Sequence, residues 1–207
     1  MYLPKSFENK NLEQLHELIE KFNFATLISH YNGETEVTHI PVMLNRSLGE
    51  YGTLFWHVAN LNPHAKLFTE NTSALLIFHG PHGYISPTWY KTASNVPTWN
   101  YAVVHAHGIV QIMDKKELAD NLTSMVNWHE NAFVQNTRYI ISNEFKSKQI
   151  EYITGFSMAI TKIEGKFKLS QNRSSEDRHG VLDGLRSHNT SDSNALADLM
   201  ESINNSA

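Results

Sequence analysis

The spacing of apolar side chains predicts that the chain begins with a helix and continues into strands. Apolar residues recur at helical spacing over residues 11–22, and Asn11 is a suitable N-terminal cap for this helix. Four apolar or alternating segments are predicted to be strands: 24–30, 35–44, 53–58 and 73–79. Asn32-Gly33 is typical of the tight turn of a hairpin between the first two strands.

A long strand is predicted over residues 99–113, because one of its faces carries only small apolar side chains. That face consists of Ala102, Val104, Ala106, Gly108 and Val110, as expected for a central barrel strand under tight packing. Two helices are predicted next, over 114–132 and 136–152. A hairpin of strands 155–163 and 166–170 is predicted to turn at Glu164-Gly165. The chain is then predicted to form a helix within 174–189 and a weak amphipathic helix after Ser193. Short strands with few crossover helices predict a mainly antiparallel β-barrel with helical decoration, an α+β fold.

Composition and charge narrow the class of protein. At 207 residues with 41% hydrophobic residues, the chain is long enough for one globular domain with a tail. The net charge of −4 gives no electrostatic attraction to DNA or to anionic membranes. The absence of cysteine excludes disulfides and thiolate sites. No apolar run approaches the ~18 residues of a membrane span, so a cytoplasmic protein is expected.

The segment from Phe78 to Tyr101 combines six aromatic residues with three prolines and two glycines. The prolines argue against a regular strand or helix, whereas the aromatic content argues against a solvated loop. Two interpretations remain open. The segment is either a long loop whose rings plug one end of a barrel, or one wall of a pocket for a flat ligand.

Three other stretches offer candidate chemistry. Asn62 and Pro63 are predicted to begin a short helix that runs to about Glu70. Its N-terminus, with Lys66 nearby, is either a binding site for a phosphate group or simply the start of a helix that connects two strands. The run from Lys168 to Ser174 places amide and cationic side chains close together, as a ligand site or as a polar exit from the last strand. The histidine pairs His79/His82 and His105/His107 favour hydrogen-bonded barrel histidines over a metal site, and no metal is expected. The acidic residues Glu176, Asp177 and Asp183 are expected to be solvated charges.

Several runs of the sequence resemble one family. They are HIP (39–41), HVANLNP (57–63), GPHGYISPTWY (80–90), VPTWNYAVVHAHG (96–108) and GKFKLSQNRSSEDRHGV (165–181). Together they resemble the PaiB family, described as FMN-binding negative transcriptional regulators and as regulators of protease synthesis and sporulation. The resemblance extends to about Leu185. It implies one split-barrel FMN-binding domain over residues 1–185, with a helical insertion near 114–152, followed by a polar tail over 186–207 with a short helix.

The resemblance also implies a homodimer with FMN at the subunit interface, and a flavin-dependent oxidoreductase activity is one expected role. The residues implied to bind the cofactor are His39, Ile40, His57, Ala59, Asn60, Asn62, Lys66, Tyr84, Ser86, Trp99, Asn100, Lys168, Gln171 and Asn172. The partner subunit would contribute residues from the aromatic segment or from the run Lys168 to Asn172. Since the isoalloxazine ring carries the redox chemistry, no catalytic side chain is assigned. A haem-binding or haem-degrading split barrel is the alternative, and direct DNA binding is not expected, because no helix-turn-helix or basic stripe is visible.

Overall fold

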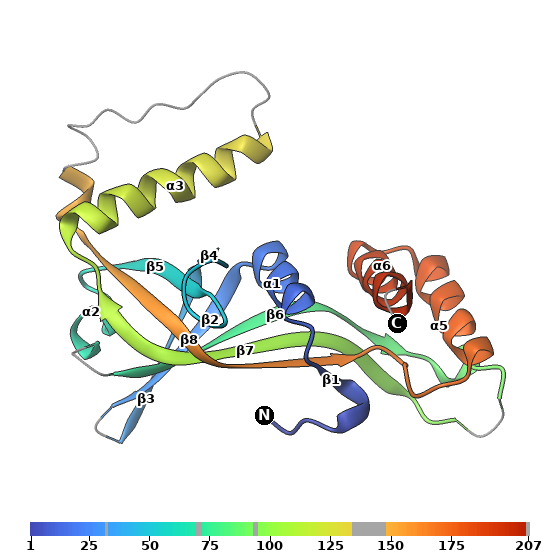
Figure 1. Ribbon diagram of the computed structural model, residues 1–207. Helices are drawn as coiled ribbons and strands as arrows, with labels where there is room; N and C mark the ends of the chain where they lie inside the picture. The colour runs from blue at the N-terminus through green and yellow to red at the C-terminus, as the bar shows by residue number, and fades with distance from the viewer. Residues whose placement is uncertain (32, 69–71, 93–94, 134–147, 206–207) are drawn as a thin grey trace. The chain divides into compact units, whose positions relative to one another are not determined.

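The computed structural model describes residues 1–31, 33–68, 72–92, 95–133 and 148–205 (Figure 1). The chain forms two compact units. The first, here called the terminal unit, consists of Met1–Leu18, Phe78–His105 and Glu164–Ala207. The second, the central unit, consists of Ile19–Ile77 and Ala106–Ile163.

The secondary structure is mainly antiparallel sheet with several helices. The strands are β1 (Glu8–Asn9), β2 (Phe24–Tyr31), β3 (Glu34–Pro41), β4 (Met43–Asn45), β5 (Thr53–Ala59), β6 (Ser73–Ile85), β7 (Thr98–Ile112) and β8 (Ile153–Lys168). The helices are α1 (Leu12–Lys21), α2 (His64–Leu67), α3 (Lys115–Phe133), α5 (Ser175–His188) and α6 (Ser191–Asn205), with 3-10 turns η1 (Lys5–Phe7) and η2 (Pro87–Trp89). The strand order is β3-β2-β6-β7-β8-β5-β4, and β1 pairs with β8.

In the central unit, alternation along each strand decides which side chains enter the core. Leu54 and Trp56 of β5 are fully buried. The ring of Trp56 packs against those of Phe68 and Phe156, with centroids 6.3 and 5.8 Å away. On β7 the predicted small face is confirmed, since a Cβ at Gly108 would lie 2.3 Å from the carbonyl oxygen of Ala159. Only glycine allows β7 and β8 to approach so closely.

Helix α3 begins at Lys115, immediately after Asp114, the residue predicted to cap it. The backbone N–H of Glu117 donates to Asp114 Oδ1 at 2.8 Å, and the Glu117 carboxylate accepts from the Asp114 N–H at 2.9 Å. This reciprocal pair satisfies two N–H groups that the helix itself leaves without partners. Leu118 then packs with Met113 and Ile150 in a small apolar cluster of the central unit.

In the terminal unit, α5 and α6 lie side by side (Figure 1). Ser174 caps α5 by accepting from the Asp177 N–H at 3.1 Å, and Asn189 ends α5 in the left-handed conformation with φ 49°. Leu196 and Met200 of α6 are fully buried. The expected boundary between domain and tail at residue 185 therefore falls inside α5.

Two predictions about the strands are wrong. The aromatic segment does not begin as a loop, because β6 continues through Pro81 to Ile85. The pairing of β6 with β2 ends at Ile77, so a proline beyond that point costs no hydrogen bond to β2. The predicted hairpin across Glu164-Gly165 is also absent, because β8 is continuous there. Gly165 instead makes room for α1, since a Cβ there would lie 2.2 Å from Leu15 Cδ2.

Other predictions have different outcomes. The predicted strand over 35–44 is divided into β3 and β4, and the short helix after Asn62 ends at Leu67 instead of continuing to Glu70. Asn32 of the predicted turn and most of the predicted helix 136–152 lie outside the described residues. In the described part of the chain, no helix is long and apolar enough to cross a membrane.

Candidate functional site

The candidate residues from His39 to Lys66 all belong to the central unit, but they do not share one face. His39 is exposed on the outer face of the β2–β3 hairpin, opposite Thr26, whose hydroxyl lies 3.2 Å from His39 Nδ1. Ile40, the next residue, points the other way and is 4% exposed. Its side chain therefore belongs to the core, whereas His39 is open to a ligand.

A buried polar network occupies the inner side of the same hairpin. His64 is fully buried, and its two ring nitrogens lie 2.8 Å from Thr38 Oγ1 and 3.0 Å from Ser29 Oγ. Burial lowers the pKa of His64 below its ordinary value, although Glu36 partly opposes this. Asn62 caps α2 by accepting from the His64 N–H at 2.9 Å and donates to Thr38 Oγ1 at 3.2 Å. The Asn62 side chain is thus engaged in holding α2 on the sheet.

Asn60 is engaged in a similar way. Its amide nitrogen donates to the Glu151 carbonyl at 2.8 Å, and its amide oxygen accepts from Thr154 Oγ1 at 2.7 Å. Its backbone N–H donates to the Tyr152 carbonyl at 2.9 Å. These bonds fix the start of β8 against the end of β5, where exposed Ala59 precedes Asn60.

His57 differs from its neighbours because one of its polar atoms is buried without a partner. Nδ1 of His57 has no hydrogen bond among the described residues. Burial lowers the pKa of the His57 imidazole, which favours the neutral ring. A buried nitrogen without a partner is costly, and it marks a position where a ligand group could satisfy it.

Lys66 is the cationic candidate of this unit. Its side chain is exposed on α2. The helix has only four residues, so its N-terminus offers little dipole of its own. The predicted phosphate seat therefore rests on the Lys66 ammonium group.

The aromatic segment lines two cavities within the terminal unit. The larger, about 410 Å³, brings together three predicted residues, Tyr84, Ser86 and Trp99. Tyr84 and Trp99 are 50% and 53% exposed, and their rings meet edge-on at 77° with centroids 6.4 Å apart. The smaller, about 360 Å³, shares Trp99 and His82 with the first. The segment therefore lines the walls of two cavities, and its role in binding a flat ligand stays a prediction.

The other terminal-unit candidates have structural partners or lie elsewhere. Asn100 is 1% exposed and donates to Ser170 Oγ at 2.9 Å, with its Oδ1 left without a partner in the described structure. Gln171 folds back on its own strand, where its Oε1 accepts from the Leu169 N–H at 2.7 Å. Lys168 donates to the Trp99 carbonyl at 2.5 Å. Asn172 is exposed beyond this turn.

Sequence reasoning missed the wall of the larger cavity that comes from the C-terminal region. His188 lines it from the end of α5, Thr190 from the loop that follows, and Asp192 and Ser193 from the start of α6. That region was expected to be a tail, and no local pattern links it to residues about 100 positions earlier. Trp89 also lines the cavity, and it was not selected although it lies within the YISPTWY motif.

The prediction that Asp177 is a solvated charge is wrong. Asp177 is 2% exposed and accepts from the N–H groups of Lys91 and Thr92 at 2.8 and 3.1 Å, and from Thr92 Oγ1 at 2.8 Å. Burial alone would raise the pKa of Asp177, but the bonds from Thr92 and Lys91, together with Arg173, lower it. Asp177 therefore fixes the loop after η2 to the first turn of α5.

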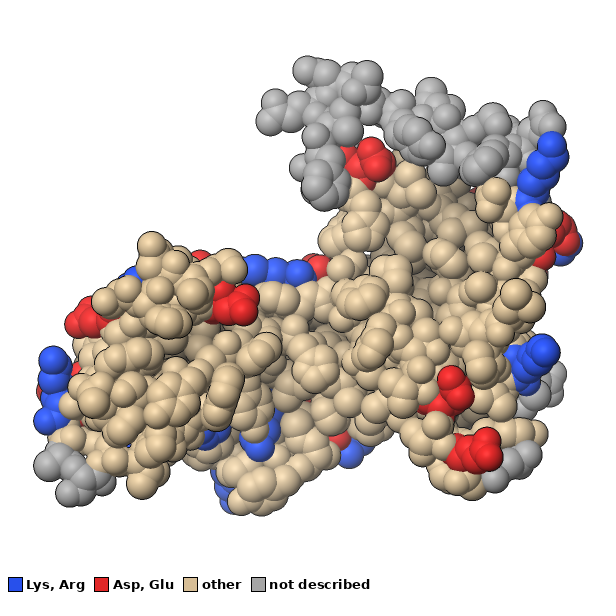
Figure 2. All heavy atoms as spheres, turned by 180° about the vertical axis from the view of Figure 1, so that it is seen from behind, with Lys and Arg blue, Asp and Glu red and all other residues tan. Residues whose placement is uncertain are grey.

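Charged side chains are scattered over the face shown in Figure 2. Groups of Lys and Arg alternate there with Asp, Glu and large uncharged areas. On this face the described residues form no continuous basic stripe of the kind that follows a nucleic-acid backbone.

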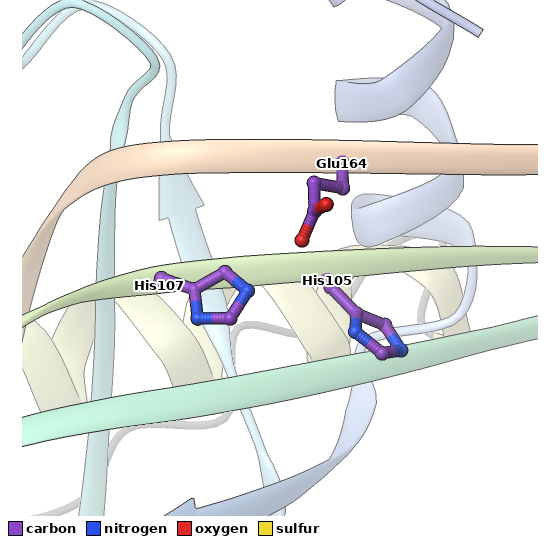
Figure 3. A group of neighbouring side chains, drawn as sticks. All are labelled: His105, His107 and Glu164. Atoms are coloured by element: carbon purple, nitrogen blue, oxygen red, sulfur yellow. The ribbon is translucent and has the colours of Figure 1, made fainter. Parts of the chain in front are cut away.

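Histidine and carboxylate ligands come together on neighbouring strands, as Figure 3 shows. In the terminal unit, ligand atoms of His105 on β7 and Glu164 on β8 lie within 4.8 Å of each other. The Glu164 carboxylate is already engaged by the Met1 ammonium group at 3.2 Å. His107 follows on β7 but belongs to the central unit. A pair of ligand residues within one unit does not make a closed metal site, which has four ligands.

Comparison with known proteins shows the family. A family model described as "Putative FMN-binding domain" matches residues 1–162. The "Protease synthase and sporulation protein PAI 2" of Bacillus subtilis is 33% identical over 202 residues, which cover 97% of each chain. Both matches include the strands and the short helix that carry His39, His57 and Lys66.

Solved structures share the fold at low sequence identity. The "FAD and Heme binding protein" from Mycobacterium smegmatis has a TM-score of 0.57 and 14% identity, over 78% of this chain and 73% of that chain. The flavocytochrome Anf3 from Azotobacter vinelandii has a TM-score of 0.56 and 18% identity, over 78% and 69%. The predicted split β-barrel is confirmed, and the chain belongs to the PaiB family of flavin-binding split-barrel proteins.

Proposed function

We propose that this protein binds FMN as a homodimer, with the cofactor on the central unit of each copy. The match to the FMN-binding family over residues 1–162 carries the proposal. Flavin binding is common to the family, and the choice of FMN and the dimer are our inference. When bound, the isoalloxazine ring supplies redox chemistry, and the protein supplies orientation and surroundings.

The outer face of the β2–β3 hairpin is the surface that we assign to the second copy. Phe24 and Val37 on this face are 66% and 48% exposed, and the ring of Phe24 lies 6.4 Å from that of His39. Exposed apolar patches of this kind mark contact surfaces. A second copy is the natural occupant, because twofold dimers are by far the commonest closed assembly.

Two groups of the central unit fit the polar parts of FMN. The unpartnered Nδ1 of His57 offers a neutral imidazole nitrogen for hydrogen bonding. Lys66 offers a cation for the phosphate, whereas the Asn60 and Asn62 side chains are already engaged elsewhere. We therefore assign the phosphate interaction to Lys66 and leave the asparagines as supports of the site.

We propose a redox or sensing role in place of direct DNA binding. The Bacillus subtilis relative is named a protease synthase and sporulation protein, and its name does not mention DNA. The net charge of −4 and the scattered charges in Figure 2 give little attraction to a phosphate backbone. Any effect on transcription would then pass through a partner protein.

Haem is the second candidate cofactor. It is favoured by the structural similarity to the FAD and haem binding protein from Mycobacterium smegmatis. Titration with haemin separates the two possibilities, because haem bound through a histidine gives a Soret band and FMN does not.

The test is a titration of cofactor-free protein with FMN, riboflavin and FAD, followed by flavin fluorescence and by light scattering for mass. We expect FMN to bind with a mass of twice 23.6 kDa. We also expect Lys66→Ala to weaken FMN about tenfold while leaving riboflavin unchanged, since one charge-assisted bond to phosphate contributes about 1.5 kcal/mol.

Lys21→Ala is the matched control, because Lys21 is an exposed lysine of the same unit that ends α1. It should leave both affinities unchanged. Absence of FMN binding, or a monomer that binds FMN fully, refutes the proposal. Equal losses for FMN and riboflavin in Lys66→Ala refute the assignment of the phosphate.

A further inference from the structure

The larger cavity of the terminal unit has features that flavin binding on the central unit does not use. Its volume of about 410 Å³ lies in the range of about 300–1,000 Å³ typical of small-molecule sites. One side is aromatic and comes from the ends of β6 and β7. The other side comes from the end of α5, the loop after it and the start of α6, and it is polar except for Leu185.

The aromatic side has the geometry of a corner. The nearly perpendicular rings of Tyr84 and Trp99 form it, and we call this pair the aromatic corner. The His82 ring lies 6.2 Å from that of Trp99, tilted by 33°. Because the face of an aromatic ring is electron-rich, two or more rings around one point attract a cation.

A third ring of the cavity is held rigidly by helix α5. A Cβ at Gly184 would lie 2.2 Å from Trp89 Cδ2, and one at Gly180 would lie 2.1 Å from the Trp89 carbonyl oxygen. These two glycines, one helical turn apart, let Trp89 lie directly on the helix. The wall is thus fixed in position before any ligand arrives, which reduces the entropic cost of binding.

The polar side carries one formal charge. When the histidines are neutral, Asp192 is the only charged residue among the described residues that line the cavity. The neighbouring groups are used locally, because the Thr190 N–H donates to Ser193 Oγ at 2.9 Å and the Ser193 N–H donates to Thr190 Oγ1 at 3.2 Å. No ion-pair partner of Asp192 is present in the described chain. An anion would meet this carboxylate and is therefore disfavoured.

We propose that this cavity is a binding site for an organic ammonium group, which the aromatic corner contacts by its ring faces and Asp192 by its carboxylate. The ring faces of the aromatic corner and the Asp192 carboxylate both attract a positive charge. The ring faces favour an alkylated ammonium over a compact, strongly hydrated cation. His57 and Lys66, to which we assign the flavin, do not line this cavity, and the FMN titration below tests whether Tyr84 and Trp99 also contact the flavin.

The test compares choline with 3,3-dimethyl-1-butanol, which has the same shape without the charge. Binding is measured by calorimetry and by the shift of the Trp99 indole N–H signal in NMR spectra. Choline should bind at least about fivefold more tightly, since a cation on an aromatic face gains about 1 kcal/mol at exposed sites. Equal affinity for the two compounds, or no binding of choline, overturns the proposal.

Two variants and two matched controls test the residues. Trp99→Ala and Asp192→Asn should each weaken choline about fivefold or more, with unchanged circular dichroism and melting temperature. The controls are Trp128→Ala and Asp183→Asn, because Trp128 is similarly exposed at 47% and Asp183 is an exposed carboxylate of α5 outside the cavity. Equal losses in the controls overturn the assignment.

Repeating the titration with FMN-saturated protein separates the two proposals. The choline affinity should be unchanged by FMN. Competition between FMN and choline would assign the cavity to the flavin and refute a separate ammonium site. Choline binding in a protein that fails to bind FMN would refute only the proposed flavin function.

Discussion

Replacing Gly184 by alanine should destabilise the protein, although the same change stabilises most helices. Gly184 lies inside α5, where alanine is favoured over glycine by about 1 kcal/mol. The added Cβ would lie 2.2, 2.5 and 2.6 Å from three atoms of the Trp89 indole ring. Overpacking a rigid ring costs about 3 kcal/mol at the upper end of its usual range, so we expect a net loss of about 2 kcal/mol.

A double-mutant cycle with Trp89→Ala tests this reasoning. Without the indole ring the clash disappears, so Gly184→Ala should stabilise the Trp89→Ala background by about 1 kcal/mol. The coupling energy between the two positions is then about 3 kcal/mol in magnitude, as found only for residues in contact. The control Ser187→Ala, at an exposed position of α5, should change stability by less than about 0.5 kcal/mol.

The measurement is urea unfolding followed by circular dichroism, with the dependence on denaturant checked for each variant. If Gly184→Ala is as stable as the parent, the close approach of Trp89 to α5 does not exist. If it destabilises equally with and without the indole ring, the cause lies elsewhere in the helix. Either result would also remove the rigid wall from the ammonium cavity.

Two further predictions concern buried polar groups. His64→Ala should lower the free energy of unfolding by about 2–4 kcal/mol. The reason is that it removes the hydrogen bonds to Thr38 and Ser29 and the stacking on the Phe68 ring, whose centroid lies 5.0 Å away. An unchanged midpoint of urea unfolding would contradict this prediction. For Asp177, the pKa in the folded state is lowered below the ordinary 3.8, so its contribution to stability is present above that pH and lost as the pH falls below it. The free energy of unfolding of Asp177→Asn should therefore fall less steeply below pH 3.8 than that of the parent. If the two plots of unfolding free energy against pH are parallel there, the carboxylate does not have this role.

Local patterns in the sequence were sufficient for most of the secondary structure. The caps at Asn11, Asp114 and Asn62 depend on residues within three positions, and each forms the expected bond. The small face of β7 also follows from alternation alone. The errors arose where one residue type occurs in two kinds of structure, as glycine does in turns and at close packing contacts. Gly165 was interpreted as a turn glycine, but its partner is Leu15, about 150 positions earlier.

The candidate site shows the same limit more clearly. The family motifs identified the flavin-binding class and selected His57 and Lys66, whose environments suit a ligand. The sequence could not show that Asn62 and Asn60 are engaged by Thr38 and by the start of β8, because those partners lie 24 and 91 positions away.

Only the tertiary structure revealed the cavity between the aromatic corner and α6. Helical and strand periodicity report which side of an element is buried, since they depend on backbone geometry over a few residues. This periodicity does not show which face of one helix or strand packs against which face of another. Trp99 and Asp192 line one cavity only because β7 and α6 pack together within the terminal unit, and that packing is decided by the shape of the whole core.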